Sequence, residues 1–173
     1  MTDELMHLLD KAHGFAKNDE PIIAFSIQPQ QTVLMSQAFA KSAPNITLEI
    51  GYENIAKQYF HHEPPTADEL EYAINTIEDE IAKVTHQVPS GLFVCQDKAI
   101  IHLAKLSGVT TEPMQLPRTQ LESLFSQYAE IITGRPARER DGETDVSAIF
   151  YARLLILREM MHHLKFSQLL CLG

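Results

Sequence analysis

The sequence of 173 residues has few cysteines, few basic residues and no long apolar run. Its two cysteines, Cys95 and Cys171, both stand in apolar stretches, which excludes a disulfide framework and a cysteine-based zinc knuckle. We therefore expect buried thiols and a cytoplasmic, reducing location. With 14 Lys and Arg against 23 Asp and Glu, the net charge of −9 argues against binding to nucleic acid. Since the N-terminus is acidic and no apolar stretch could span a membrane, we expect neither a leader peptide nor a membrane partner.

Helical and alternating apolar patterns follow one another along the chain. Helical spacing predicts helices over residues 3–16, 52–60, 67–85, 98–107, 119–132 and 145–164. Strands are expected at residues 22–25, 33–35, 46–50, 91–95, 114–116 and 167–172. Three leading strands followed by alternating helices and strands predict a mixed α/β fold on one sheet. The length is typical of one domain, with residues 1–20 as an N-terminal helix and 21–173 as the α/β unit.

The turn between the first two strands has no glycine. A buried strand at residues 22–25 leads through a polar turn into Thr32 and a second apolar run, which predicts a hairpin. Turns that hold phosphate are usually rich in glycine, because backbone N–H groups must approach the anion. Here the turn is Gln28-Pro29-Gln30-Gln31, and Pro29 has no N–H to offer. An ordinary hairpin and a phosphate-binding turn that has lost its chemistry both fit this stretch.

The order of these elements resembles the second half of the exopolyphosphatase and guanosine pentaphosphate phosphohydrolase (Ppx/GppA) family. The family's Asp-Ile-Gly-Gly-Gly-Ser-Thr loop falls on residues 26–32, and its strand, helix and Pro-Pro break fall on residues 50–70. Its second glycine-rich loop and helix fall on residues 93–104, and its closing loop, helix and strand fall on residues 134–173. The similarity covers the chain from about residue 21 onward. It implies a ribonuclease H-like domain of the actin-like ATPase superfamily.

The resemblance also indicates which parts of the family's chemistry are missing. Ser26 stands where the family has an Asp that organises a metal and the attacking water, and Gln28, Pro29 and Gln30 replace three glycines. The second loop has Gln-Asp-Lys-Ala at residues 96–99. We also expect the family's first domain, which supplies a catalytic Glu, to be missing. We therefore expect a degenerate, non-hydrolytic relative with no catalytic residue and no cofactor, which acts as a binding or regulatory module.

Two alternatives keep a phosphate or nucleotide ligand. A phosphohydrolase acting on polyphosphate or guanosine polyphosphate would use Mg²⁺ held by Asp97 or Asp141, and a regulatory module would bind a nucleotide without cleaving it. Arginine forks suit phosphate, although acids alternate with the arginines of the loop at residues 135–143. The candidate phosphate-binding residues are Thr32, Gln30, Gln31, Arg135, Arg138 and Arg140.

Two adjacent histidine pairs are candidate metal ligands, since imidazole and carboxylate together are a common zinc ligand set. The pairs are His61-His62 beside Glu63, and His162-His163 near Glu159. Adjacent residues on a helix point in different directions, so the second pair cannot face one ion together. The alternative, which we favour, is that one histidine of each pair packs at the end of an element while its neighbour meets water. On the same helix, Arg158 is expected to pair with Glu159 or with Glu122.

A homodimer is the expected partner. A half-domain that normally packs against a second domain carries an apolar face, and a second copy of the chain would cover that face.

Overall fold

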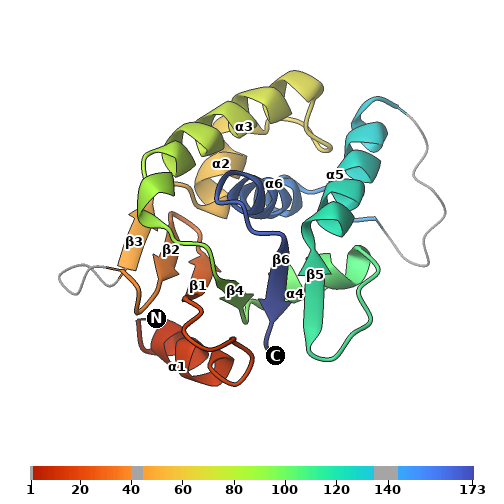
Figure 1. Cartoon of the computed structure of the whole chain (residues 1–173). Coiled ribbons are helices and arrows are strands. Elements are labelled where there is room, and N and C mark those ends of the chain that lie inside the picture. The colour runs from red at the N-terminus through yellow and green to blue at the C-terminus, as the bar shows by residue number, and fades with distance from the viewer. Residues whose placement is uncertain (1, 40–44, 135–143) are drawn as a thin grey trace.

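The structure is a computed structural model, and it describes residues 2–39, 45–134 and 144–173. Its helices are α1 (Thr2–Ala12), α2 (Tyr52–Tyr59), α3 (Ala67–Ala82), α4 (Lys98–Leu106), α5 (Arg118–Ile132) and α6 (Ala148–His163), with a short 3-10 helix η1 (Thr85–Gln87). Its strands are β1 (Ile22–Ile27), β2 (Thr32–Met35), β3 (Asn45–Leu48), β4 (Leu92–Cys95), β5 (Met114–Pro117) and β6 (Gln168–Cys171). This order confirms the predicted mixed α/β fold (Figure 1).

Six strands form one mixed sheet in the order β3-β2-β1-β4-β6-β5 (Figure 1). Strands β1, β2 and β3 form an antiparallel meander, with Ile27 opposite Thr32 at the first hairpin turn. Strand β4 pairs in parallel with β1 and with β6, and β5 lies antiparallel at the edge. The carboxyl ends of β1 and β4 therefore meet beside the hairpin turn. Open sheets with parallel strands bind their ligands at such ends.

Helices cover both faces of the sheet, but unequally (Figure 1). Ile23 and Phe25 of β1 point into a large core that contains side chains of α2 to α6. Ile22 and Ala24, one position out of phase, point into a smaller core formed with α1. Helix α6 lies in the middle of the helical layer, in contact with α2, α3 and α5, and is buried on nearly every side.

Helix α1 covers an apolar face of the sheet. Its buried side chains, Leu5, Leu8, Leu9 and Ala12, pack against side chains of β1, β2, β4 and β6. The homodimer was expected because an exposed apolar face would need a second copy to cover it, and in this chain α1 covers one apolar face of the sheet. Part of the same chain packs on this face of the sheet, and the homodimer stays a prediction.

Most of the predicted helix boundaries are confirmed to within a few residues. Thr66 and Glu69 form the capping box at the start of α3, and Gly108 has a φ of +87° after α4. Helix α1 ends at Ala12 rather than at residue 16, because the following backbone N–H groups bond three residues back and tighten the chain into a turn. Helix α6 begins after Ser147, whose hydroxyl caps it, rather than at residue 145.

The expectation of buried thiols is confirmed in the structure. Cys95 and Cys171 are free, buried and opposite each other on β4 and β6, with their Sγ atoms 3.7 Å apart. Within the described ranges, no helix is both long enough and apolar enough to pass through a membrane.

Candidate functional site

The turn that follows β1 is closed by the first residues of α2. Tyr52 N donates to the Gln28 carbonyl at 3.0 Å. Glu53 N and Asn54 N both donate to the Pro29 carbonyl, at 2.9 and 3.2 Å. The first N–H groups of a helix have no partner inside the helix, and they commonly bind an anion or a capping group. In this chain, carbonyl oxygens of the hairpin turn cap three of them.

The side chains predicted to hold phosphate at this turn are engaged with the protein itself. Thr32 is fully buried, at 0% exposure, and its hydroxyl donates to the Ile50 carbonyl at 2.7 Å. The amide of Gln30 lies 3.4 Å from a Glu53 carboxylate oxygen, and the amide of Gln31 donates to Gln28 at 3.3 Å. Phosphate binding by these residues stays a prediction. The other three candidates, Arg135, Arg138 and Arg140, lie outside the described residues.

The carboxyl ends of β1 and β4 form a small hollow beneath α1. Its volume is about 220 Å³, and its lining includes Ser26, Gln96, Asp97 and Glu4. Asp97 also caps α4, since its Oδ1 accepts a hydrogen bond from Ala99 N at 2.7 Å. The described lining contains two acids and no Lys or Arg, so its charge disfavours a phosphate group. Asp141, the alternative candidate for a metal ligand, lies outside the part of the chain that the structure describes.

The two histidine pairs differ from each other. His61 and His62 are both exposed, and His62 Nδ1 lies 2.9 Å from Glu69 Oε1. The expectation that one member packs away from water is therefore wrong for this pair, because the segment between α2 and α3 lies at the surface. It is confirmed for the second pair: His162 is 54% exposed, whereas His163 is 34% exposed and turns toward α3.

Arg158 makes both of its expected ion pairs. Its Nε donates to Glu122 Oε2 at 2.7 Å, and its Nη1 donates to Glu159 Oε1. The Glu159 side chain is only 2% exposed, so this pair lies inside the helical layer. Burial opposes the charge on Arg158, but hydrogen bonds and the attraction of the two carboxylates outweigh it and raise the pKa of the guanidinium.

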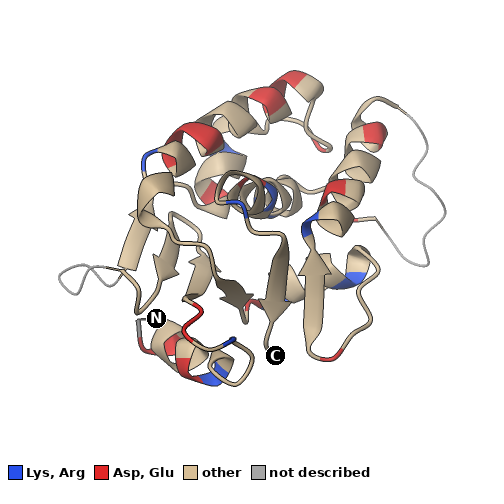
Figure 2. Cartoon of the chain, viewed as in Figure 1, with Lys and Arg blue, Asp and Glu red and all other residues tan. Residues whose placement is uncertain are grey.

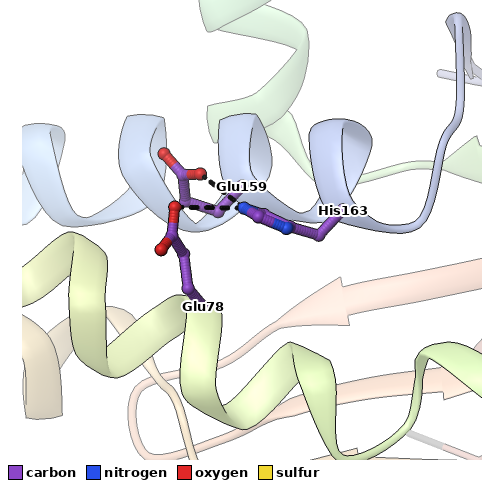
Figure 3. A group of neighbouring side chains, drawn as sticks. All are labelled: Glu78, Glu159 and His163. Atoms are coloured by element: carbon purple, nitrogen blue, oxygen red, sulfur yellow. Dashed lines mark hydrogen bonds and ion pairs between the residues drawn. The ribbon is translucent and has the colours of Figure 1, made fainter.

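The structure brings one further residue to this region that the sequence did not single out. Glu78 of α3 joins Glu159 and His163, so that two carboxylates and an imidazole converge (Figure 3). The spacing of four between Glu159 and His163 places them on one side of a helix, and this spacing was visible in the sequence. Glu78 carried no such signal, because 85 residues separate it from His163.

The fold resembles solved structures of Ppx/GppA proteins. An Aquifex aeolicus Ppx/GppA family member matches with a TM-score of 0.69 and 17% identity, over 98% of this chain and 57% of that one. An exopolyphosphatase from Cytophaga hutchinsonii matches with a TM-score of 0.63 and 12% identity, over 96% of this chain and 58% of that one. The predicted resemblance is thus confirmed for the fold, over little more than half the length of these proteins. No protein-family model and no curated protein matches the sequence.

Proposed function

We propose that this chain is a non-hydrolytic relative of the Ppx/GppA proteins that acts as a binding or regulatory module. The observation that carries the proposal is the contact between the hairpin turn and α2. The N–H groups of Tyr52, Glu53 and Asn54 already donate to carbonyl oxygens of the turn. An anion could reach these donors only by displacing those bonds and turning the carbonyls away. A turn that held phosphate would instead direct its own N–H groups toward the anion.

The hollow beneath α1 supports the same conclusion. Hydrolysis needs a general base near the attacking water, and the hydroxyl of Ser26 is a poor base compared with the carboxylate that the family resemblance implies there. Asp97 is one of two acids in the described lining, and its Oδ1 caps α4. Glu4 adds a second negative charge at the same hollow. The negative charge on a phosphoryl group is stabilised by cations and not by carboxylates, so the two acids in this hollow disfavour phosphoryl transfer.

Phosphate release tests the proposal directly. The protein is incubated with polyphosphate and, separately, with guanosine pentaphosphate, in the presence of Mg²⁺ or Mn²⁺. We expect no phosphate release above that of a heat-denatured sample. Steady turnover that Ser26→Ala or Asp97→Asn abolishes would overturn the proposal and favour the alternative of a phosphohydrolase with non-standard site residues.

Binding without turnover is tested by thermal unfolding against a panel of nucleotides, pyrophosphate and tripolyphosphate. A ligand of the native state raises the melting temperature by mass action, by an amount that grows with ligand concentration. A rise without phosphate release supports a ligand-binding module. In that case, Gln30→Ala and Arg138→Ala variants test whether the turn or the arginine loop contributes to binding.

A cytoplasmic location and self-association belong to the same proposal. The two free, buried thiols are suited to a reducing compartment. A homodimer would have to use a surface other than the sheet face covered by α1, and sedimentation at micromolar concentration tests whether it forms. A single monomeric species would remove the dimer from the proposal and leave the binding function to a ligand or a different protein.

A further inference from the structure

Three side chains from two helices converge between α3 and α6 (Figure 3). His163 Nε2 lies 3.1 Å from Glu78 Oε1 and 3.4 Å from Glu159 Oε2. The three ligand atoms all lie within 4.8 Å of one another. Tetrahedral ligands about 2 Å from one zinc ion stand roughly 3.3 Å apart, which is close to the two distances from His163 Nε2 to the carboxylate oxygens.

The backbone holds this group in place. Glu159 and His163 are one turn apart on α6, and Glu78 projects toward them from α3, which packs directly on α6. Burial differs among the three, because the Glu159 side chain is 2% exposed while those of His163 and Glu78 are 34% and 39% exposed. The group is therefore buried on the side of Glu159 and open to water on the side of His163 and Glu78, through which an ion can enter.

Charge also favours a cation at this position. Glu78, Glu122 and Glu159 are three carboxylates, and Arg158 is the one permanent cation among the described side chains paired with them. These four side chains carry two negative charges in excess, and only protonation of both His163 and His162, which lies 3.8 Å from Glu122, would offset them. Burial raises the pKa of Glu159, and the nearby Glu78 carboxylate adds to this effect while Arg158 opposes it. A divalent cation beside a neutral imidazole would offset both excess charges.

The acidity of α3 extends this argument beyond the three side chains. The helix contains six Asp and Glu residues and no Lys or Arg (Figure 2). A cation approaching α3 from solvent therefore meets a negative field before it reaches Glu78.

We propose that Glu78, Glu159 and His163 form a binding site for a divalent transition-metal ion, with Zn²⁺ as the best match, that ties α3 to α6. One imidazole nitrogen and two carboxylate oxygens provide three protein ligands, and water completes the fourth position. Mg²⁺ and Ca²⁺ prefer six or more oxygen ligands, so the imidazole selects against them. The site lies between α3 and α6, on the face of the sheet opposite α1, and is independent of the hairpin turn and of the proposed non-hydrolytic function.

Metal titration of the full chain tests this site. Protein freed of metal by a chelator is titrated with Zn²⁺ in a calorimeter, and with Co²⁺ while its visible absorption is recorded. We expect one ion per chain, a cobalt spectrum typical of a four-coordinate site, and a melting temperature that rises with Zn²⁺ concentration. His163→Ala and Glu78→Gln should each weaken binding by about tenfold or more. Both side chains are partly exposed, and circular dichroism checks that the variants fold.

Two histidine variants serve as matched controls. His162→Ala removes the neighbouring imidazole, which lies 3.8 Å from Glu122, and His62→Ala removes an exposed imidazole of the other pair, which is paired with Glu69. Both variants should bind Zn²⁺ as the unchanged protein does. The proposal is overturned if no saturable binding is seen, if binding survives both His163→Ala and Glu78→Gln, or if only the control variants weaken it.

Discussion

Gly51 lies directly against the backbone of Gln30. A Cβ atom at position 51 would stand 2.3 Å from the Gln30 carbonyl carbon and 2.4 Å from the Pro29 carbonyl oxygen. The φ of Gly51 is −119°, so its backbone conformation suits any residue, and glycine is required here only for space. This close approach lets carbonyl oxygens of the hairpin turn cap the first N–H groups of α2, the donors that an anion would otherwise use.

Gly51→Ala should destabilise the protein. The added methyl group meets backbone atoms on both sides of the turn, and these can move only by breaking the hydrogen bonds between the turn and α2. We expect the free energy of unfolding to fall by about 3 kcal/mol. Urea denaturation measures the change, with Gly14→Ala as the control, because a Cβ atom at Gly14 has no other atom within 4 Å. An unchanged midpoint in Gly51→Ala would mean that the turn and α2 are not in contact.

The thiols should be unreactive in the folded protein. Cys95 and Cys171 are 0% and 3% exposed, so a reagent cannot reach either sulfur in the folded chain. Burial also raises the pKa of the Cys95 thiol, whereas the hydrogen bond with Cys95 lowers the pKa of Cys171, so burial alone protects the second thiol. A thiol reagent must wait for the chain to open, which slows reaction by roughly 1,000-fold or more relative to the unfolded chain. Counting reacted thiols with and without urea should give two per chain only in urea. Fast reaction of either thiol without urea would contradict the burial of β4 and β6.

Glu69 should link stability to acid pH. Burial would raise the pKa of this carboxyl, but hydrogen bonds from Thr66 N, His62 Nδ1 and His61 N, together with the charge of His62, outweigh burial and lower the pKa from 4.5 to about 2. Because the folded pKa is the lower one, Glu69 contributes stability above pH 4.5, and this contribution is lost as the pH falls from about 4.5 to about 2.

Replacing Glu69 tests this dependence. Glu69→Gln should lower the free energy of unfolding by about 1 kcal/mol at pH 7, and the difference from the unchanged protein should shrink as the pH falls below 4.5. Urea denaturation at a series of pH values measures both effects. Glu71→Gln, an exposed position on the same helix, should change stability by no more than about 0.5 kcal/mol. A difference that is constant with pH would show that the charge of Glu69 plays no part in the capping box.

The elements of the fold could be predicted because their causes are local. The hairpin follows from two apolar runs around a polar turn, and the start of α3 follows from the spacing of Thr66 and Glu69. The order of elements resembles that of the Ppx/GppA family, and this was enough to predict the fold, which matches the solved structures of that family. The end of α1 was placed four residues too late, because apolar spacing continued to Phe15 after the helical hydrogen bonds had stopped.

The partners of individual side chains could not be predicted, because they depend on register and packing. Thr32 was a candidate phosphate ligand, yet the pairing of β2 with β3 places its hydroxyl beneath the Ile50 carbonyl. Glu78 joins His163 only because α3 packs on α6. The amphipathic pattern of α1 likewise predicted a helix but not the sheet face that the helix covers.

Leu8 tests the role of α1 as the cover of that face. Its side chain is fully buried between α1 and the sheet. Leu8→Asp would place an unpaired charge in this core, so we expect α1 to detach and the free energy of unfolding to fall by about 3 kcal/mol. The uncovered sheet face then presents Ile22, Val94 and Leu170 to solvent. Stronger binding of a hydrophobic dye and increased self-association in sedimentation should follow.

The control for this prediction is His7→Asp, which adds the same charge at an exposed neighbouring position of α1 and should change stability by no more than about 0.5 kcal/mol. Sedimentation of the unchanged protein distinguishes two arrangements. If the unchanged chain is monomeric and Leu8→Asp associates, α1 covers an apolar face through which copies of the chain would otherwise associate. If the unchanged chain is dimeric and Leu8→Asp is monomeric, the docked α1 contributes to the dimer interface, and the expected increase in self-association is wrong.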